Sequence, residues 1–222
     1  MSKIEDLISK LCPNGIEWKT IGDISTIVTK QTGFDYSATI KPSLVRDKSE
    51  ENYPYIQTRD FSGHKFNYDT EFYIPKDIAK NFPKIILDSK CILVSIVGSI
   101  GNVGLFSGEK TCFLGGAICV IKLKEDVNID FIYYCLESNI GQKQLVKKTK
   151  GSGQATVTIE DIRNFKIPLP PLAVQREIVH VLDEFTLLSQ ELAAELAARK
   201  AQYEFYRDKL LTFDDIAGGG TT

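Results

Sequence analysis

The sequence lacks the features that mark several large classes of protein. No apolar run approaches the roughly 18 residues needed to cross a membrane, and the segment from Met1 to Ile8 has no apolar stretch like that of a signal peptide. The 222 residues are 43% hydrophobic and 25% charged, which is typical of a globular protein. We therefore expect a cytoplasmic protein with no membrane association.

Residues that bind metals are also scarce. The two histidines, His64 and His180, lie far apart in the sequence, and the five cysteines show no C-x-x-C spacing. Most of the cysteines have apolar neighbours, as buried free thiols do. Because a zinc site needs several such ligands together, we predict no metal site and no cofactor.

The net charge of −2 is distributed unevenly. Residues 1–168 hold 22 Lys and Arg against 20 Asp and Glu, whereas residues 169–222 hold five against nine. Within the first part, no acid lies between Ser138 and Ile159, and this stretch carries four lysines, Lys143, Lys147, Lys148 and Lys150. Such a run is either a solvated helix face or a local patch that contacts phosphate.

A glycine-rich segment, VGSIGNVGLFSGEKT, occupies residues 97–111. A nucleotide-binding loop would need the last glycine directly before the lysine, but Glu109 separates Gly108 from Lys110 and would repel phosphate. The earlier glycines do not follow the G-x-G-x-x-G pattern either. We therefore predict turns and close backbone approach within a sheet.

The pattern of apolar residues predicts an α+β domain rich in sheet. Helical spacing appears at residues 1–12 and again at 128–147. Short runs rich in β-branched and aromatic residues predict strands at 16–28, 53–61, 71–74, 91–97, 102–106 and 116–123. The polar, turn-rich segment from Thr32 to Glu51 is expected to be an exposed loop.

A proline cluster, IPLPPL at residues 167–172, predicts a domain boundary, because proline suits neither a central strand nor a helix interior. Residues 172–211 beyond it contain no proline or glycine. This favours a globular domain at 1–168, a helix within 169–213 and a flexible tail at 214–222.

The helical part has a heptad seam, in which apolar residues recur at alternating steps of four and three. A helix of this length measures about 60 Å, so it either folds back on its own domain or, as we prefer, pairs with another helix. The apolar seam positions are Ile178, Leu182, Phe185, Leu192, Leu196, Tyr203, Tyr206 and Leu210, with Ser189 and Arg199 as polar interruptions.

No catalytic pattern is convincing. An amino-group methyltransferase would need an Asn or Asp before Pro-Pro and an aromatic residue after it, but the only such pair stands between Leu169 and Leu172. Two histidines supply no credible triad. Asp60 and Glu71 are better explained as a turn residue and a surface charge, so we expect a protein that is not an enzyme.

Four motifs together resemble the DNA specificity subunit of type I restriction-modification systems. They are YIQTRD (55–60), ILVSIVGSIGNVG (92–104), GSGQ (151–154) and IPLPPLAVQREI (167–178), the last followed by the long helix. The resemblance runs from about Trp18 to Leu211. It implies a target recognition domain and one conserved spacer helix, as in half-sized specificity subunits that act in pairs.

The resemblance also implies partners, whereas the DNA contacts are predicted from residue chemistry. The expected partners are double-stranded DNA, methyltransferase subunits, restriction subunits where a system has them, and a second half-subunit bound through an antiparallel coiled coil. A homodimer would read a split, palindromic target, whereas a different half as partner would not. We predict DNA contacts by Arg59, Ser99, Asn102, Lys143, Lys147, Lys148, Lys150, Ser152 and Gln154. The alternatives are a fragment of a DNA-modifying enzyme and a coiled-coil adaptor without DNA specificity.

Overall fold

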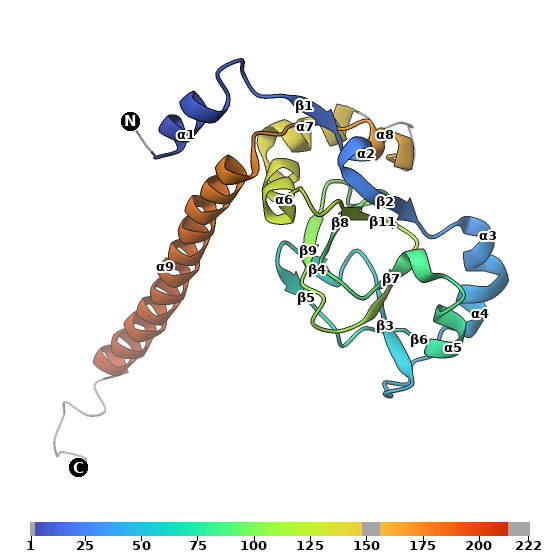
Figure 1. Ribbon diagram of the computed structural model, residues 1–222. Helices are drawn as coiled ribbons and strands as arrows, with labels where there is room; N and C mark the ends of the chain where they lie inside the picture. Colours follow the sequence, from blue (N-terminus) through green and yellow to red (C-terminus); the bar gives the residue numbers. More distant parts are fainter. Residues whose placement is uncertain (1–2, 148–155, 213–222) are drawn as a thin grey trace, which may run out of the picture. The chain divides into compact units, whose positions relative to one another are not determined.

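The computed structural model describes residues 3–147 and 156–212 (Figure 1). The chain forms two compact units, one ending at Arg176 and one beginning at Glu177. The division lies beyond the boundary that the proline cluster suggested, because the first turn of the long helix belongs to the first unit. Within the described ranges, no helix has the length and apolar character to cross a membrane.

A four-stranded antiparallel sheet is the centre of the first unit. Its strand order is β2 (Ser25–Lys30), β11 (Ile118–Leu123), β8 (Cys91–Ser95) and β9 (Val103–Phe106). All residues of β8 and β9 are buried. This burial accounts for their continuous apolar sequence, since neither face of these strands meets solvent.

A second sheet has the order β6 (Tyr73–Pro75), β3 (Asn52–Ile56), β10 (Cys112–Leu114) and β7 (Ile86–Leu87). Strands β3 and β10 are parallel and the other pairs are antiparallel. Side chains of both sheets form one hydrophobic cluster, which includes Ile56, Leu93, Phe106, Phe113 and Leu114. The two sheets therefore stabilise each other through a shared core.

Shorter elements complete the first unit. The two-stranded pairs are β1 (Trp18–Thr20) with β12 (Lys166–Pro168) and β4 (Phe61–Ser62) with β5 (Lys65–Phe66). The helices are α1 (Lys3–Leu11), α2 (Ile21–Ile24), α3 (Gly33–Asp35), a π-helical turn (Tyr36–Ile40), α4 (Lys41–Ser43), α5 (Lys76–Ala79), a 3-10 turn (Pro83–Ile85), α6 (Ile129–Glu137), α7 (Asn139–Lys147) and α8 (Ile159–Arg163).

Two expectations from the sequence are wrong. The segment from Thr32 to Glu51 is not simply an exposed loop: it contains α3, the π-helical turn and α4, with Ile40 fully buried in the shared core. The segment 128–147 is two helices and not one, because Ser138 adopts an extended conformation and ends α6. In both places a local capping residue, which an apolar count does not register, sets the outcome.

The proline cluster leads into α9 (Leu172–Thr212) through a buried glutamine. Gln175 is 2% exposed; its Nε2 donates to the Pro170 carbonyl at 2.7 Å, and its Oε1 accepts from the Asn128 N–H at 3.0 Å. The motif therefore ties the start of α9 to the first turn of α6. Both contacts lie within the first unit.

The long helix confirms the predicted element. Its 41 residues are uninterrupted, and the chain is a sheet-rich α+β domain followed by one long C-terminal helix. Most large apolar side chains along α9 are exposed: Phe185, Leu187, Leu188, Leu192, Leu196, Tyr203, Phe205, Tyr206, Leu210 and Leu211. Ile178 and Leu182, at its beginning, are half-buried. Pairing of this seam as a coiled coil stays a prediction.

Candidate nucleic-acid interface

A tight turn between β3 and β4 presents Arg59 to solvent. The Gln57 N–H donates to Asp60 Oδ2 at 2.8 Å, and the Asp60 N–H donates back to the Gln57 carbonyl at 2.9 Å. Asp60 is 5% exposed, and this burial raises the pKa of its carboxyl group. Its expected role as a turn residue is confirmed. Arg59 stands on the exposed side of a turn that is closed by two hydrogen bonds.

The glycine-rich segment supports this turn through hydrogen bonds from Asn102. Asn102 Nδ2 donates to the carbonyls of Thr58 at 3.2 Å and Phe61 at 2.8 Å. A Cβ at Gly104 would overlap the Phe61 ring, so glycine is required for this close approach. The glycine spacing thus serves backbone approach in a sheet, as predicted. Both amide hydrogens of Asn102 are used inside the protein, which leaves its Oδ1 for any further contact.

Helix α7 also contacts the glycine-rich segment, at Gly101. Gln142 Nε2 donates to the Gly101 carbonyl at 3.0 Å, and the next residue, Lys143, is exposed. Val97 forms an isolated antiparallel bridge with Thr156, and Ser99 between these contacts is exposed. The structure therefore connects Arg59, Ser99, Asn102 and the beginning of α7 through residues 97–104.

The remaining predicted DNA contacts cannot be placed in the same way. Lys148, Lys150, Ser152 and Gln154 lie outside the described residues. Lys147 ends α7, and its side chain is likewise outside the description. The contacts proposed for these residues stay predictions.

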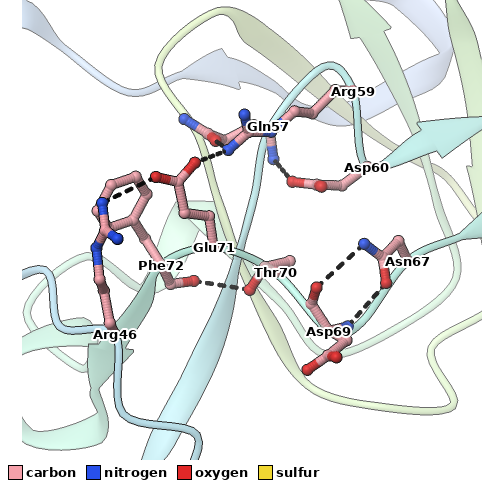
Figure 2. Close-up of polar contacts among 9 residues, drawn as sticks. All are labelled: Arg46, Gln57, Arg59, Asp60, Asn67, Asp69, Thr70, Glu71 and Phe72. Atoms are coloured by element: carbon pink, nitrogen blue, oxygen red, sulfur yellow. Dashed lines mark hydrogen bonds and ion pairs between the residues drawn. The ribbon is translucent and has the colours of Figure 1, made fainter.

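Beside the turn, two arginines share one carboxylate (Figure 2). Arg46 Nη2 lies 3.1 Å from Glu71 Oε1, and Arg59 Nη2 pairs with Glu71 Oε2. Arg59 Nη2 also donates to Gln57 Oε1 at 2.8 Å. The Arg46 guanidinium stands 5.3 Å from the centroid of the Phe72 ring, a distance that permits a cation–π interaction. We call Arg46, Gln57, Arg59 and Glu71 the arginine cluster.

The arginine cluster is exposed and carries a surplus of positive charge. The side chains of Arg46 and Arg59 are 76% and 58% exposed, against 39% for Glu71. The hydrogen bond that Arg59 donates to Glu71 raises the pKa of Arg59 above its usual value. Sequence reasoning identified Arg59 but missed Arg46, and it treated Glu71 as an isolated surface charge. No local signal links Arg46 to Glu71, because 25 positions separate them.

A second basic surface is a cleft of about 570 Å³ that includes Lys48, Lys76 and Lys110 in its lining, together with one acid, Glu50. Lys48 forms an ion pair with Asp69 at 2.8 Å, and the Lys76 ammonium lies 5.5 Å from the centroid of the Tyr53 ring. Lys110 comes from the glycine-rich segment. The cleft has the charge to hold an anion but shows no nucleotide-binding loop.

The described residues include no group of three or more His, Cys, Asp or Glu side chains placed to hold a metal. His64 packs edge-on against Tyr133, with the ring centroids 4.8 Å apart. Burial raises the pKa of four thiols to about 12, those of Cys91, Cys112, Cys119 and Cys135. These cysteines are therefore protonated and unreactive as nucleophiles near neutral pH.

The fold and these surfaces define the class: a sheet-rich α+β module with an exposed basic cluster, joined to one long helix with an apolar seam. The model of the type I restriction modification DNA specificity domain matches residues 13–198. The chain belongs to this family.

Individual relatives agree with the family. The chain is 26% identical over 204 residues to the type I restriction enzyme EcoR124I/EcoR124II specificity subunit of Escherichia coli, covering 89% of this chain and 48% of that protein. It is 40% identical over 145 residues to the EcoprrI specificity subunit of the same species, covering 57% and 35%. The chain spans about half the length of the curated relatives that it matches over most of its own length.

A solved structure shows the same fold. The HsdS subunit from Thermoanaerobacter tengcongensis superposes with a TM-score of 0.66 at 18% sequence identity, over 95% of this chain and 49% of that one. At this identity the likeness shows the fold alone.

Proposed function

We propose that this chain is the sequence-reading component of a type I restriction-modification system. It binds double-stranded DNA through the first unit and brings methyltransferase subunits, and restriction subunits where present, to a defined target. It carries no catalytic group of its own. The observation that supports this most directly is the rigid turn that presents Arg59, because a base-reading side chain must be held in register with the DNA.

Backbone contacts complete the proposed interface. Lys143 is exposed directly after Gln142, the residue that holds the glycine-rich segment. Lys147, Lys148 and Lys150 follow it in the sequence and would add phosphate contacts, each of which releases counterions when DNA binds. Ser99, Asn102, Ser152 and Gln154 are the proposed hydrogen-bonding residues beside them.

The long helix is the proposed site of self-association. Its exposed seam is apolar at heptad spacing, and such a surface is stable in water when another helix covers it. Two copies joined by antiparallel helices would be related by a two-fold axis, so both recognition units would read the same half-site in opposite orientations. The target would then be palindromic, with an unread spacer between the two half-sites.

The experiment that tests the function is single-molecule methylation sequencing of cells that express the chain together with its methyltransferase subunit. Cells that express the methyltransferase alone are the control. We expect a split palindromic motif that depends on the chain. An asymmetric motif would instead show pairing with a different half, and the absence of any new motif would favour an adaptor without DNA specificity.

A second measurement tests the backbone contacts. We expect that replacing Lys147 and Lys148 by alanine reduces the magnitude of the slope of log K against log salt by about 2 for each recognition unit, and so by about 4 for the proposed dimer, since each phosphate contact contributes roughly 0.9. The matched control replaces two exposed lysines, Lys80 at the C-cap of α5 and Lys84 in the 3-10 turn that follows. An equal change in both double variants would remove the α7 lysines from the interface.

A further inference from the structure

We propose that the arginine cluster is a guanine-reading element and that Glu71 is the residue that positions its two guanidinium groups. This inference rests on the proposed function and names a base specificity and two residues, Arg46 and Glu71, beyond it. Three features support it: the contacts that order both arginines, the N–H groups that these contacts leave unused, and the carboxylate of Glu71 between the two guanidinium groups.

The guanidinium of Arg59 is held from two directions before any ligand arrives. Its Nη2 group donates to Gln57 Oε1 at 2.8 Å and to Glu71 Oε2 (Figure 2). Arg46 is fixed by the other oxygen of Glu71 and by the Phe72 ring. Free arginine side chains lose considerable rotamer entropy when they bind, and an arginine that is already ordered avoids much of that loss.

Each guanidinium keeps donors that are directed elsewhere. Across the described part of the chain, Nη1 and Nε of Arg46 and of Arg59 make no hydrogen bond, and both side chains are more than half exposed. Guanine presents two acceptors, O6 and N7, at the edge of the major groove. Adenine presents one acceptor beside a donor, and that donor would face the N–H groups of arginine. Both Nη2 hydrogens of Arg59 are already used, so the two acceptors of guanine would be matched by unused donors of the two arginines together, and this combined set discriminates in favour of guanine.

The central carboxylate argues against a phosphate as the ligand. Glu71 lies in contact with both guanidiniums and is 39% exposed, so a phosphate bound there would be repelled by a like charge at short range. The edge of a guanine is neutral and meets no such repulsion. The lysine-lined cleft has Lys48, Lys76 and Lys110 against Glu50 and the Asp69 that pairs with Lys48, and it suits the phosphate backbone better because its ammonium groups do not share one central carboxylate. Lys48 follows Arg46 by two positions, so base and backbone contacts would be adjacent in the chain.

The test compares the motifs of Arg59→Ala, Arg46→Ala and Glu71→Gln with that of the parent chain. Methylation sequencing reports the motif, and selection of random DNA by the purified complex with its methyltransferase subunits measures discrimination at each position. We expect a guanine in the parent half-site and a loss of discrimination of about tenfold or more at that position in Arg59→Ala. Glu71→Gln keeps both positive charges but should relax the same position.

Two variants separate positioning from general effects. Arg59→Lys preserves the charge without the planar fork, so we expect it to keep the salt slope of the parent while the guanine preference stays lost. Glu109→Gln removes another exposed carboxylate, outside the arginine cluster, and should leave the motif unchanged. Thermal unfolding of all variants shows whether a changed motif reflects the fold.

Four outcomes would overturn the inference. One is an unchanged motif in Arg59→Ala and Glu71→Gln. Another is uniform weakening on all sequences with a salt slope smaller in magnitude by about 1 for each recognition unit, which indicates a phosphate contact. A parent half-site without guanine would also reject it, as would equal relaxation in Glu109→Gln. If the parent chain confers no motif at all, the proposed function itself fails, and the two failures are thereby distinguished.

Discussion

The first unit and the long helix use their apolar residues in opposite ways. In the first unit, Phe106 and Phe113 are fully buried in a core shared by two sheets, whereas on α9 the side chain of Phe185 is 66% exposed. One region completes its core with its own residues. The other carries an ordered apolar seam that stabilises an assembly only when a second helix covers it.

The difference shows that apolar residues can serve either the stability of a domain or its association with a partner. Buried in a core they stabilise the domain, and exposed along a helix they are available to a second helix. A helix rich in Ala, Leu and Glu forms readily by intrinsic propensity, so α9 does not need a surrounding core to specify its secondary structure. The strands of the first unit do need one, because a strand is stable only when its neighbours and its faces are supplied.

The sharpest test of this contrast removes one buried and one exposed phenylalanine. We expect Phe113→Ala to lower the free energy of unfolding of the first unit by about 3–5 kcal/mol, since it leaves a cavity in the shared core. Phe185→Ala should change that free energy by less than about 0.5 kcal/mol. Urea unfolding followed by the fluorescence of the single tryptophan, Trp18, measures both. Equal losses would show that the seam is part of the same folding unit.

A second prediction tests whether the apolar seam of α9 mediates self-association, by placing a charged side chain in it. We expect Leu192→Glu to weaken self-association at least ~100-fold, or about 2.7 kcal/mol, because it places a carboxylate in the apolar seam. Sedimentation velocity over a range of concentrations measures the effect. Leu187→Glu is the matched control, since Leu187 is a similarly exposed leucine that lies off the heptad seam. A monomeric Leu187→Glu with a dimeric Leu192→Glu would place the contact on another face.

The smallest effect concerns the support of the Arg59 turn. Asn102→Ala removes two hydrogen bonds and leaves the carbonyls of Thr58 and Phe61 without them, so we expect a loss of about 1–2 kcal/mol in unfolding free energy. Amide hydrogen exchange should rise in the turn while α9 is unchanged. Ser99→Ala, at an exposed position of the same segment, is the control. Indistinguishable exchange in the two variants would contradict the supporting role of Asn102.

Much of the fold follows from local patterns in the sequence. The apolar runs locate the strands of the main sheet and the proline cluster locates the change of architecture. The stretch without proline or glycine, residues 172–211, predicts the bounds of α9 to within a residue. The errors occur where a short polar residue competes with periodicity. Thr32 caps α3 and Ser138 ends α6, and neither effect appears in a count of apolar positions.

The candidate site is less accessible to such reasoning. Arg59 could be suggested from its motif, and the role of Asp60 follows from turn chemistry. Arg46 could not be found, because its partner Glu71 belongs to a different segment and the pair forms only when the chain is folded. The same holds for Asn102, whose amide reaches the carbonyls of the turn more than 40 positions away.

The sequence by itself therefore determined the class of the fold, the division into a sheet-rich domain and a long helix, and the apolar seam on that helix. These properties depend on periodicity and propensity, which act over a few neighbouring residues. Tertiary structure alone decided that the glycine-rich segment supports the Arg59 turn and that Glu71 joins two arginines. Such contacts link residues that are distant in the chain. The bridge between Val45 and Tyr73 brings Arg46 near Glu71, and only the folded chain places Asn102 within hydrogen-bonding distance of the turn.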